Sequence, residues 1–226
     1  GDDFPLLDQP PATAMAAART TLQRIGASKE LALLPTDPRL GAALLRYGSG
    51  AAETIAKLDE EPRGDITRAP APKRLVQRLA KLVPDLGPVD PGAVVAAAYP
   101  EQVARAVSAG ASGLRTGSNS GARSGSGASP SSGAGTSREY LLASGTRARL
   151  LSDFSLADAE WLAVAEISLS NAGNAIIRSA ARITEDDALE AIGVEETTTA
   201  TVDGGKIRGR KRRRAGAIEL SSTPVQ

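Results

Sequence analysis

Trp161-Leu-Ala-Val-Ala-Glu-Ile-Ser-Leu169 carries the pattern on which our prediction of the fold rests. Its odd-numbered positions are all apolar, whereas its two polar residues, Glu166 and Ser168, fall on even-numbered positions. This period of two is that of a β-strand, because successive side chains of a strand point to opposite faces of the sheet. A turn at Asn171-Ala-Gly173 and a further strand at 175–183 are predicted to follow.

Shorter predicted strands flank these two. Residues 140–144 and 146–151 lie on either side of a tight turn, and 197–202 precedes a final hairpin over 206–220. Thr184 is predicted to cap one short helix that follows the second long strand. Five or six strands with one short helix are typical of a small β-barrel of the oligonucleotide-binding (OB) kind.

The chain before residue 108 shows helical signals instead. Predicted helices begin near Pro10, Pro38, Pro72 and Pro91. Proline suits the first position of a helix, where its missing N–H would be unpaired in any case, and apolar residues then recur at helical spacing. Pro100 is expected to kink or end the fourth helix. We therefore predict an α+β chain in which a small helical bundle precedes the barrel.

A stretch rich in glycine and serine separates the two halves. In residues 108–137, 18 of 30 are Gly or Ser. Such a stretch cannot bury enough apolar surface to offset the entropy lost on ordering, so we predict it to be disordered. It is either a linker between domains or an insertion within one.

The net charge of +1 conceals a strong partition of charge. Residues 1–107 are neutral, residues 138–205 hold 12 acids and five bases, and residues 206–226 hold seven bases and one acid. An acidic block is thus followed by a basic strip with a balance of +6. An asymmetry of this kind indicates contact with a polyanion more than the net charge does.

The basic strip is Lys206-Ile-Arg-Gly-Arg-Lys-Arg-Arg-Arg214. In a strand its even-numbered residues lie on one face, about 6.6–6.8 Å apart, and this row of cations could follow a sugar–phosphate backbone with little regard to sequence. The candidate nucleic-acid-binding residues are Lys206, Arg208, Arg210, Lys211, Arg212, Arg213 and Arg214, with Arg147 and Arg149 from another predicted strand. The alternatives are a solvated edge strand made basic to prevent aggregation, and a strip whose partners lie in the acidic block.

Several kinds of site are excluded or disfavoured. The sequence contains no His and no Cys, so serine–histidine hydrolases, thiol enzymes, zinc fingers and disulfides are ruled out. The acidic run Glu185-Asp-Asp187 follows Thr184 and is interpreted as stabilising a helix N-terminus, not as a magnesium site. Trp161 is expected in the core. No apolar run is long enough for a membrane span and no signal peptide opens the chain, so we expect a cytoplasmic protein.

Several blocks in order resemble one helicase family. Phe4-Pro-Leu-Leu-Asp8 and Leu34-Pro-Thr-Asp-Pro38 resemble the region that follows the motor domains of DEAH-box helicases. Ala98-Tyr-Pro-Glu-Gln-Val-Ala104, Ala159-Glu-Trp-Leu-Ala-Val164 and Arg210-Lys-Arg-Arg-Arg-Ala-Gly216 are similar to the bacterial HrpB-type branch. Together with Tyr140-Leu-Leu-Ala-Ser-Gly145, these blocks cover most of the chain outside the glycine- and serine-rich stretch.

The resemblance implies a division into four parts. Residues 1–34 would be a degenerate winged-helix remnant, because Ser28-Lys-Glu30 stands where the family has a longer stretch. Residues 35–107 would form a ratchet-like helical bundle, residues 108–137 an insertion before the first barrel strand, and residues 138–226 the OB-like domain. In this family such accessory domains close the floor of an RNA channel beneath two ATP-hydrolysing motor domains.

The resemblance therefore implies an accessory region of an HrpB-like ATP-dependent RNA helicase, with RNA or single-stranded nucleic acid and the motor domains as partners. This chain contains no phosphate loop and no Asp-Glu-x-His box, so ATP and Mg²⁺ are expected only in motor domains outside it. The chain begins with Gly1, not Met, and we expect it to be a piece of a longer protein. The alternative is a non-enzymatic module for protein–protein interaction.

Overall fold

The computed structural model describes residues 10–24, 26, 30–107, 138–151, 155–169, 175–203 and 206–225. For residues 21, 24, 200–203, 206–208 and 225 the description is limited to the backbone. The predicted insertion at 108–137, the whole segment before Pro10 and the predicted turn at Asn171-Ala-Gly173 lie outside these residues.

Helices fill the first half, as the proline-led pattern predicted. The α-helices are α1 (Ala12–Arg24), α2 (Pro38–Tyr47), α3 (Ala52–Asp59), α4 (Lys73–Ala80), α5 (Pro91–Ala98) and, later in the chain, α6 (Glu185–Ile192). Short 3-10 turns connect them at η1 (Leu31–Leu33), η2 (Gly48–Ala51), η3 (Ile66–Arg68) and η4 (Pro100–Gln102). Carboxylates cap two of the helices: the Asp37 side chain accepts from Arg39 N at 2.8 Å, and Asp90 accepts from Gly92 N at 2.8 Å.

A closed five-stranded barrel follows, as expected for an OB-like domain. Its strands are β2 (Val103–Ala106), β3 (Arg138–Leu142), β4 (Arg147–Leu150), β5 (Trp161–Leu169) and β6 (Ala175–Arg182). They are joined in the order β2-β3-β4-β6-β5, and β5 pairs with β2 to close the ring. The β4–β6 pair is parallel and the others are antiparallel. Apolar side chains fill the interior, with Tyr140 the largest that is fully buried.

The barrel begins earlier than the sequence indicated. We assigned residues up to 107 to the helical bundle, but Val103–Ala106 is a barrel strand that pairs with both β3 and β5. Tyr99 precedes Pro100 and leaves the helical region, with φ −132° and ψ 61°, because proline disfavours the helical conformation in the residue before it. In chain order, residues 108–137 therefore fall between the first and second barrel strands, not ahead of the barrel.

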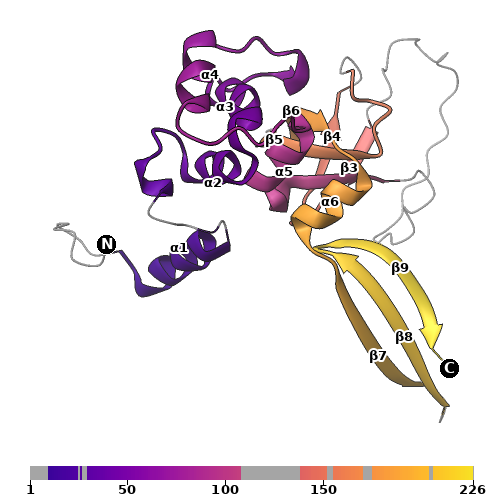
Figure 1. The fold of residues 1–226 in the computed structure, drawn as a ribbon. Coiled ribbons are helices and arrows are strands. Elements are labelled where there is room, and N and C mark those ends of the chain that lie inside the picture. Colours follow the sequence, from indigo (N-terminus) through magenta and orange to yellow (C-terminus); the bar gives the residue numbers. More distant parts are fainter. Residues whose placement is uncertain are drawn as a thin grey trace, which may run out of the picture.

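The last three strands form a sheet of their own. Strands β7 (Glu195–Asp203), β8 (Lys206–Ala215) and β9 (Ile218–Val225) are antiparallel in the order β7-β8-β9. Figure 1 shows this sheet projecting from the body of the molecule. We had counted these strands toward the barrel, but pairing of β6 with β4 and β5 already closes it. The turn between β8 and β9 is tied to the barrel, because Ala217 N donates to Ala143 O at 2.9 Å.

Helix α5 connects the bundle to the barrel. Its Val94 and Val95 are fully buried in one cluster with Ile55 of α3 and with Trp161 and Ala181 of the barrel strands. Figure 1 shows the helices α2–α5 gathered on one side of the barrel. This shared core fixes the bundle against the barrel.

Gly92→Ala is expected to weaken this junction by about 1–3 kcal/mol. A Cβ at Gly92 would overlap with the carbonyl oxygen of Arg182, a backbone atom of β6 that cannot turn away. Gly41→Ala is the matched control: its nearest neighbours are the terminal methyl groups of Leu31 and Leu34, which can move, and alanine favours the helix. Urea unfolding should show a clearly lower midpoint for Gly92→Ala alone; equal midpoints for both variants would contradict this close approach.

Candidate nucleic-acid interface

The basic strip forms the central strand of the projecting sheet, with its cations divided between two faces. On one face, Lys211 and Arg213 share the carboxylate of Glu196 on β7, at 2.7 Å for Lys211 Nζ and 3.3 Å for Arg213 Nε. The hydrogen bond from Lys211, followed by the charges of Lys211 and Arg213, lowers the pKa of Glu196 below its ordinary value. This carboxylate is therefore ionised at neutral pH and offsets part of the charge on that face.

The other face carries arginines without such a partner. Arg210 donates from Nη1 to Ser222 Oγ at 3.4 Å, and Arg212 lies opposite Ser222 in the β8–β9 register. Arg214 lies between Glu195 of β7 and Glu219 of β9 in the register. Among the residues that the structure describes, no carboxylate comes within ion-pair distance of Arg210, Arg212 or Arg214. We call Arg210, Arg212 and Arg214 the open arginines of β8.

These contacts separate two of our interpretations. Pairing with the acidic block applies to Lys211 and Arg213, since Glu196 belongs to that block. It does not apply to Arg210 and Arg212. Arg214 lies opposite Glu195 of that block in the register, but among the described residues it forms no ion pair. Lys206 and Arg208 lie on β8 as predicted, opposite Asp203 and Thr201, but their side chains are outside the description.

The half-buried Arg212 also leaves a polar atom without a partner. Its Nε is buried and has no hydrogen-bond partner among the described residues. A buried donor without a partner is unfavourable. A ligand oxygen reaching this face could supply the missing acceptor.

Arg147 and Arg149 lie on β4 of the barrel, not on the sheet that carries β8. Both are exposed. Arg147 Nη1 is 3.5 Å from Glu139 Oε1 on β3, and Arg149 lies opposite Glu139 in the register. The outer surface of the second and third barrel strands, which here are β3 and β4, is the face on which OB-folds bind oligonucleotides.

A groove of about 550 Å³ brings Arg147 close to the projecting sheet. Arg105, Arg138 and Arg147 line it from the barrel, and Ile218 and Glu219 line it from the start of β9. Arg149 does not line the groove. The structure thus places one of the two predicted barrel arginines beside the sheet of β8 and leaves the other farther along β4.

Arg105 and Arg138 were not predicted from the sequence. Arg105 pairs with Glu160 at 3.0 Å, and its guanidinium lies 5.4 Å from the ring of Trp161. Arg138 donates to Ala157 O at 3.1 Å. We did not consider Arg105 because we assigned residues 103–107 to the helical bundle. The strand that carries it is only four residues long, which is too short to show a period of two.

The remaining sequence interpretations concern Trp161 and the acidic run. Trp161 is 3% exposed and belongs to the core, as expected. Thr184 Oγ1 accepts from Asp187 N at 3.2 Å, so the acidic run does lie in the first turn of a capped helix. In the described ranges, no three acidic side chains are grouped to hold a metal ion, and none of the helices has the length and apolar character needed to cross a membrane.

Two solved structures of HrpB share this arrangement. The DExH-box NTPase HrpB of E. coli matches with a TM-score of 0.69 and 25% identity over 97% of this chain. A second structure, the DEAH/RHA helicase HrpB of Escherichia coli, gives a TM-score of 0.70 and 23% identity over 99% of this chain. The chain resembles the C-terminal region of an HrpB-type helicase. It spans 28% of the length of each HrpB chain that it matches.

The HrpB resemblance predicted from scattered sequence blocks is thus confirmed by structure. Comparisons with protein-family models and with curated proteins gave no match. At 23–25% identity most positions differ, so the shared feature is the arrangement of bundle, barrel and projecting sheet. The chain therefore has the fold of a helicase accessory region, as found in HrpB.

Proposed function

We propose that this HrpB-like chain is the RNA- or single-strand-binding accessory region of an ATP-dependent helicase. The observation that carries the proposal is the set of open arginines on β8, which have no carboxylate partner within the described residues. Guanidinium groups presented in this way bind phosphate oxygens through charge-assisted hydrogen bonds. Binding would depend on the backbone and not on the base sequence.

The groove beside β9 supports a path for the strand from the sheet to the barrel. A strand lying on the open arginines would reach Arg147 through the groove and then the outer surface of β3 and β4. Glu160 and Glu219 in the groove oppose close contact by phosphates. We therefore propose that phosphates bind mainly at β8 and that bases and sugars lie nearer the groove.

The wider roles follow from the HrpB resemblance. In the proposed parent protein, motor domains would bind ATP and Mg²⁺ and would be a partner of this region, and the protein would be cytoplasmic. Residues 1–34 would be a winged-helix remnant and residues 35–107 would provide the ratchet-like bundle, except that the final strand of that range belongs to the barrel.

Single-stranded RNA is expected to bind the full chain with strong salt dependence. Each phosphate contact with a single strand contributes about 0.7 to the slope of log K against log salt, so three open arginines give a slope of about −2 or steeper. Fluorescence anisotropy between 50 and 200 mM salt measures this slope. Absence of binding at 50 mM salt would overturn the proposal and favour the alternative, a protein–protein interaction module.

A further inference from the structure

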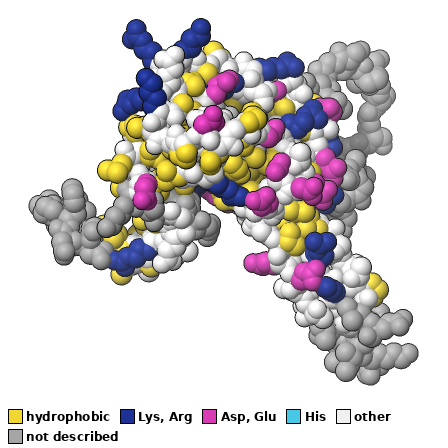
Figure 2. All heavy atoms as spheres, in the orientation of Figure 1, with side chains coloured by type: hydrophobic (Ala, Val, Ile, Leu, Met, Phe, Trp, Pro, Cys, Tyr) yellow, Lys and Arg dark blue, Asp and Glu magenta, His cyan; other side chains and the backbone are white. Residues whose placement is uncertain are grey.

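The neutral total of residues 1–107 conceals a second basic segment. Residues 63–81 contain six bases and one acid. The bases are Arg63, Arg68, Lys73, Arg74, Arg78 and Lys81. All six are exposed, and Figure 2 shows Lys and Arg side chains gathered at the end of the molecule that carries α4. Among the described residues, Arg68 is the only one of these six with an ion pair, 3.7 Å from Asp65.

A pocket opens where this segment meets the barrel. The two-residue strand β1 (Gly64–Asp65) runs parallel to β6 and pairs with Ser179 and Ala180. Farther back on β6, β4 pairs with Ala175 and Ile176. Between these two pairings, Ile177 and Arg178 have no described strand partner on this edge. The gap forms a pocket of about 860 Å³, within the usual size range for small-ligand sites.

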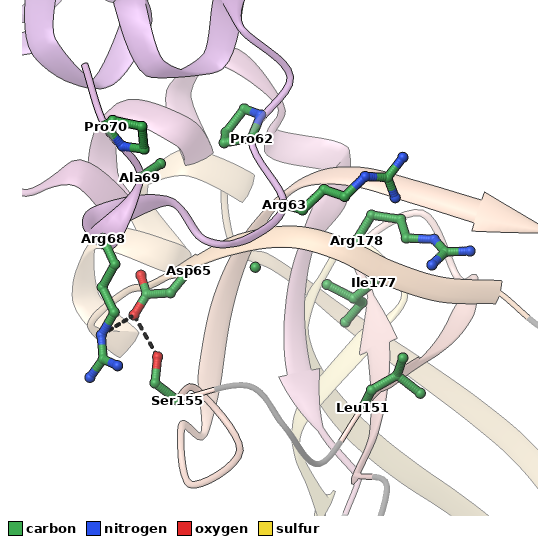
Figure 3. A pocket seen from close by; sticks show the side chains of 11 residues that line it. Pro62, Arg63, Asp65, Arg68, Ala69, Pro70, Leu151, Ser155, Ile177 and Arg178 are labelled. Carbon is green, nitrogen blue, oxygen red and sulfur yellow. Dashed lines mark hydrogen bonds and ion pairs between the residues drawn. The ribbon is translucent and has the colours of Figure 1, made fainter.

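The pocket combines cationic and apolar walls. Arg63, Arg68 and Arg178 supply three guanidinium groups, and its apolar lining is Pro62, Ala69, Pro70, Leu151 and Ile177. Arg178 Nε donates to Ser168 Oγ at 2.6 Å, which fixes the side chain. In Figure 3 the guanidinium groups of Arg63 and Arg178 extend in the same direction, away from Asp65.

Among the described residues that line the pocket, Asp65 is the one acid, and both of its carboxylate oxygens accept hydrogen bonds. Asp65 Oδ1 accepts from Thr67 N at 2.9 Å, and Oδ2 accepts from Ser155 Oγ at 2.8 Å. Burial opposes ionisation of Asp65, but the hydrogen bonds from Thr67 and Ser155 outweigh it and lower the pKa of the carboxyl. Asp65 is therefore ionised and offsets part of the positive charge of the pocket. Figure 3 shows it turned toward Arg68 and Ser155, and among the described residues it forms no ion pair with Arg63 or Arg178.

We propose that this junction pocket binds one nucleotide of a single-stranded nucleic acid. The guanidinium groups of Arg63 and Arg178 hold its phosphate, and the base lies against the apolar wall that includes Leu151. The inference rests on the proposed function and extends it, because the pocket is built from the bundle segment and β6 and does not include β8. A strand bound at both places would contact the bundle as well as the projecting sheet.

The test compares two double variants of the full chain that lose the same charge. Arg63→Gln with Arg178→Gln removes the pocket cations, whereas Arg74→Gln with Arg78→Gln removes two exposed cations of α4 that do not line the pocket. The two arginines share one phosphate, so the pocket variant loses one phosphate contact. This loss reduces the salt slope for single-stranded RNA by about 0.7 and the affinity at 0.1 M salt by about fivefold. The α4 variant is expected to stay within about twofold of the wild type.

Three outcomes would overturn the pocket and are distinguishable from failure of the proposed function. Equal losses in the two variants would assign the effect to overall charge. If the pocket variant binds with wild-type affinity while mutation of β8 still abolishes binding, the proposed function stands but the pocket has no part in it. Binding of UMP as tight as that of the strand would indicate a free nucleotide as the occupant. If the wild type binds no strand at all, the proposed function fails as well. Circular dichroism melting confirms that both variants are folded.

Discussion

Replacement of Arg208, Arg210, Arg212 and Arg214 together by Ala is expected to remove most of the affinity of the chain for single-stranded RNA. The open arginines have no carboxylate partner among the described residues, and the sequence assigns Arg208 to the same row. Loss of four phosphate contacts makes the salt slope less steep by about 2.8. If the two proteins converge at 1 M salt, the difference at 0.1 M is several hundred-fold, on the order of 10^2.8. A filter-binding titration measures it.

A matched pair of double variants assigns this effect to one face of β8. Arg210→Ala with Arg212→Ala removes two cations from the open face, and Lys211→Ala with Arg213→Ala removes two that share Glu196. The charge change is the same, so a purely non-specific attraction predicts equal losses. The contacts predict a loss of about 25-fold for the first variant and a much smaller one for the second. Equal losses would contradict a one-sided interface.

The sequence predicted those helices and strands whose pattern is visible in their own residues. The alternation in β5 and the proline-led starts of α2 and α5 depend on neighbours in the sequence, and the structure has these elements as predicted. The alternation along β8 likewise separated Arg210 and Arg212 from Lys211 and Arg213. Each of these predictions needed only the period of a strand or the chemistry of a helix start.

Long-range pairing accounts for what the sequence did not reveal. Val103–Ala106 is too short to show a period, and it is a strand because β3 and β5 lie on either side of it. The separation of β7, β8 and β9 from the barrel likewise follows from the closure of the ring by β6. Such pairings join segments far apart in the chain, and the period of a single strand does not specify its neighbours.

The net charge of residues 1–107 concealed the basic segment that lines the junction pocket. The balance of zero over residues 1–107 averages the basic segment 63–81 with acids elsewhere. The pocket also needs Arg178 and Leu151, which lie more than 60 residues away in sequence. A site assembled from separate segments appears in the sequence as isolated arginines, each of which resembles an ordinary solvated residue.

Tyr140→Ala is expected to lower the free energy of unfolding by about 3–5 kcal/mol, because it leaves a large cavity inside the barrel. Tyr140 is 0% exposed and lies among Leu142, Leu150 and Leu162. The buried cluster that contains Tyr140 has members on all five barrel strands, so they cannot collapse onto the space without disturbing the ring. Urea unfolding followed by circular dichroism measures the change. A loss below about 1 kcal/mol would contradict the packing described for the barrel interior.

Tyr140→Phe distinguishes the contribution of the aromatic ring to stability from that of the hydroxyl group. The hydroxyl donates to Ala159 O at 2.7 Å and ties β3 to the segment before β5. Phenylalanine keeps the ring but leaves that buried carbonyl without its donor, at a cost of about 1–3 kcal/mol. The order Ala worse than Phe worse than wild type is therefore expected. Because β3 and β4 carry the outer surface with Arg147 and Arg149, a folded Tyr140→Phe chain should retain wild-type RNA affinity, whereas Tyr140→Ala should lose affinity as the fraction of unfolded chain rises.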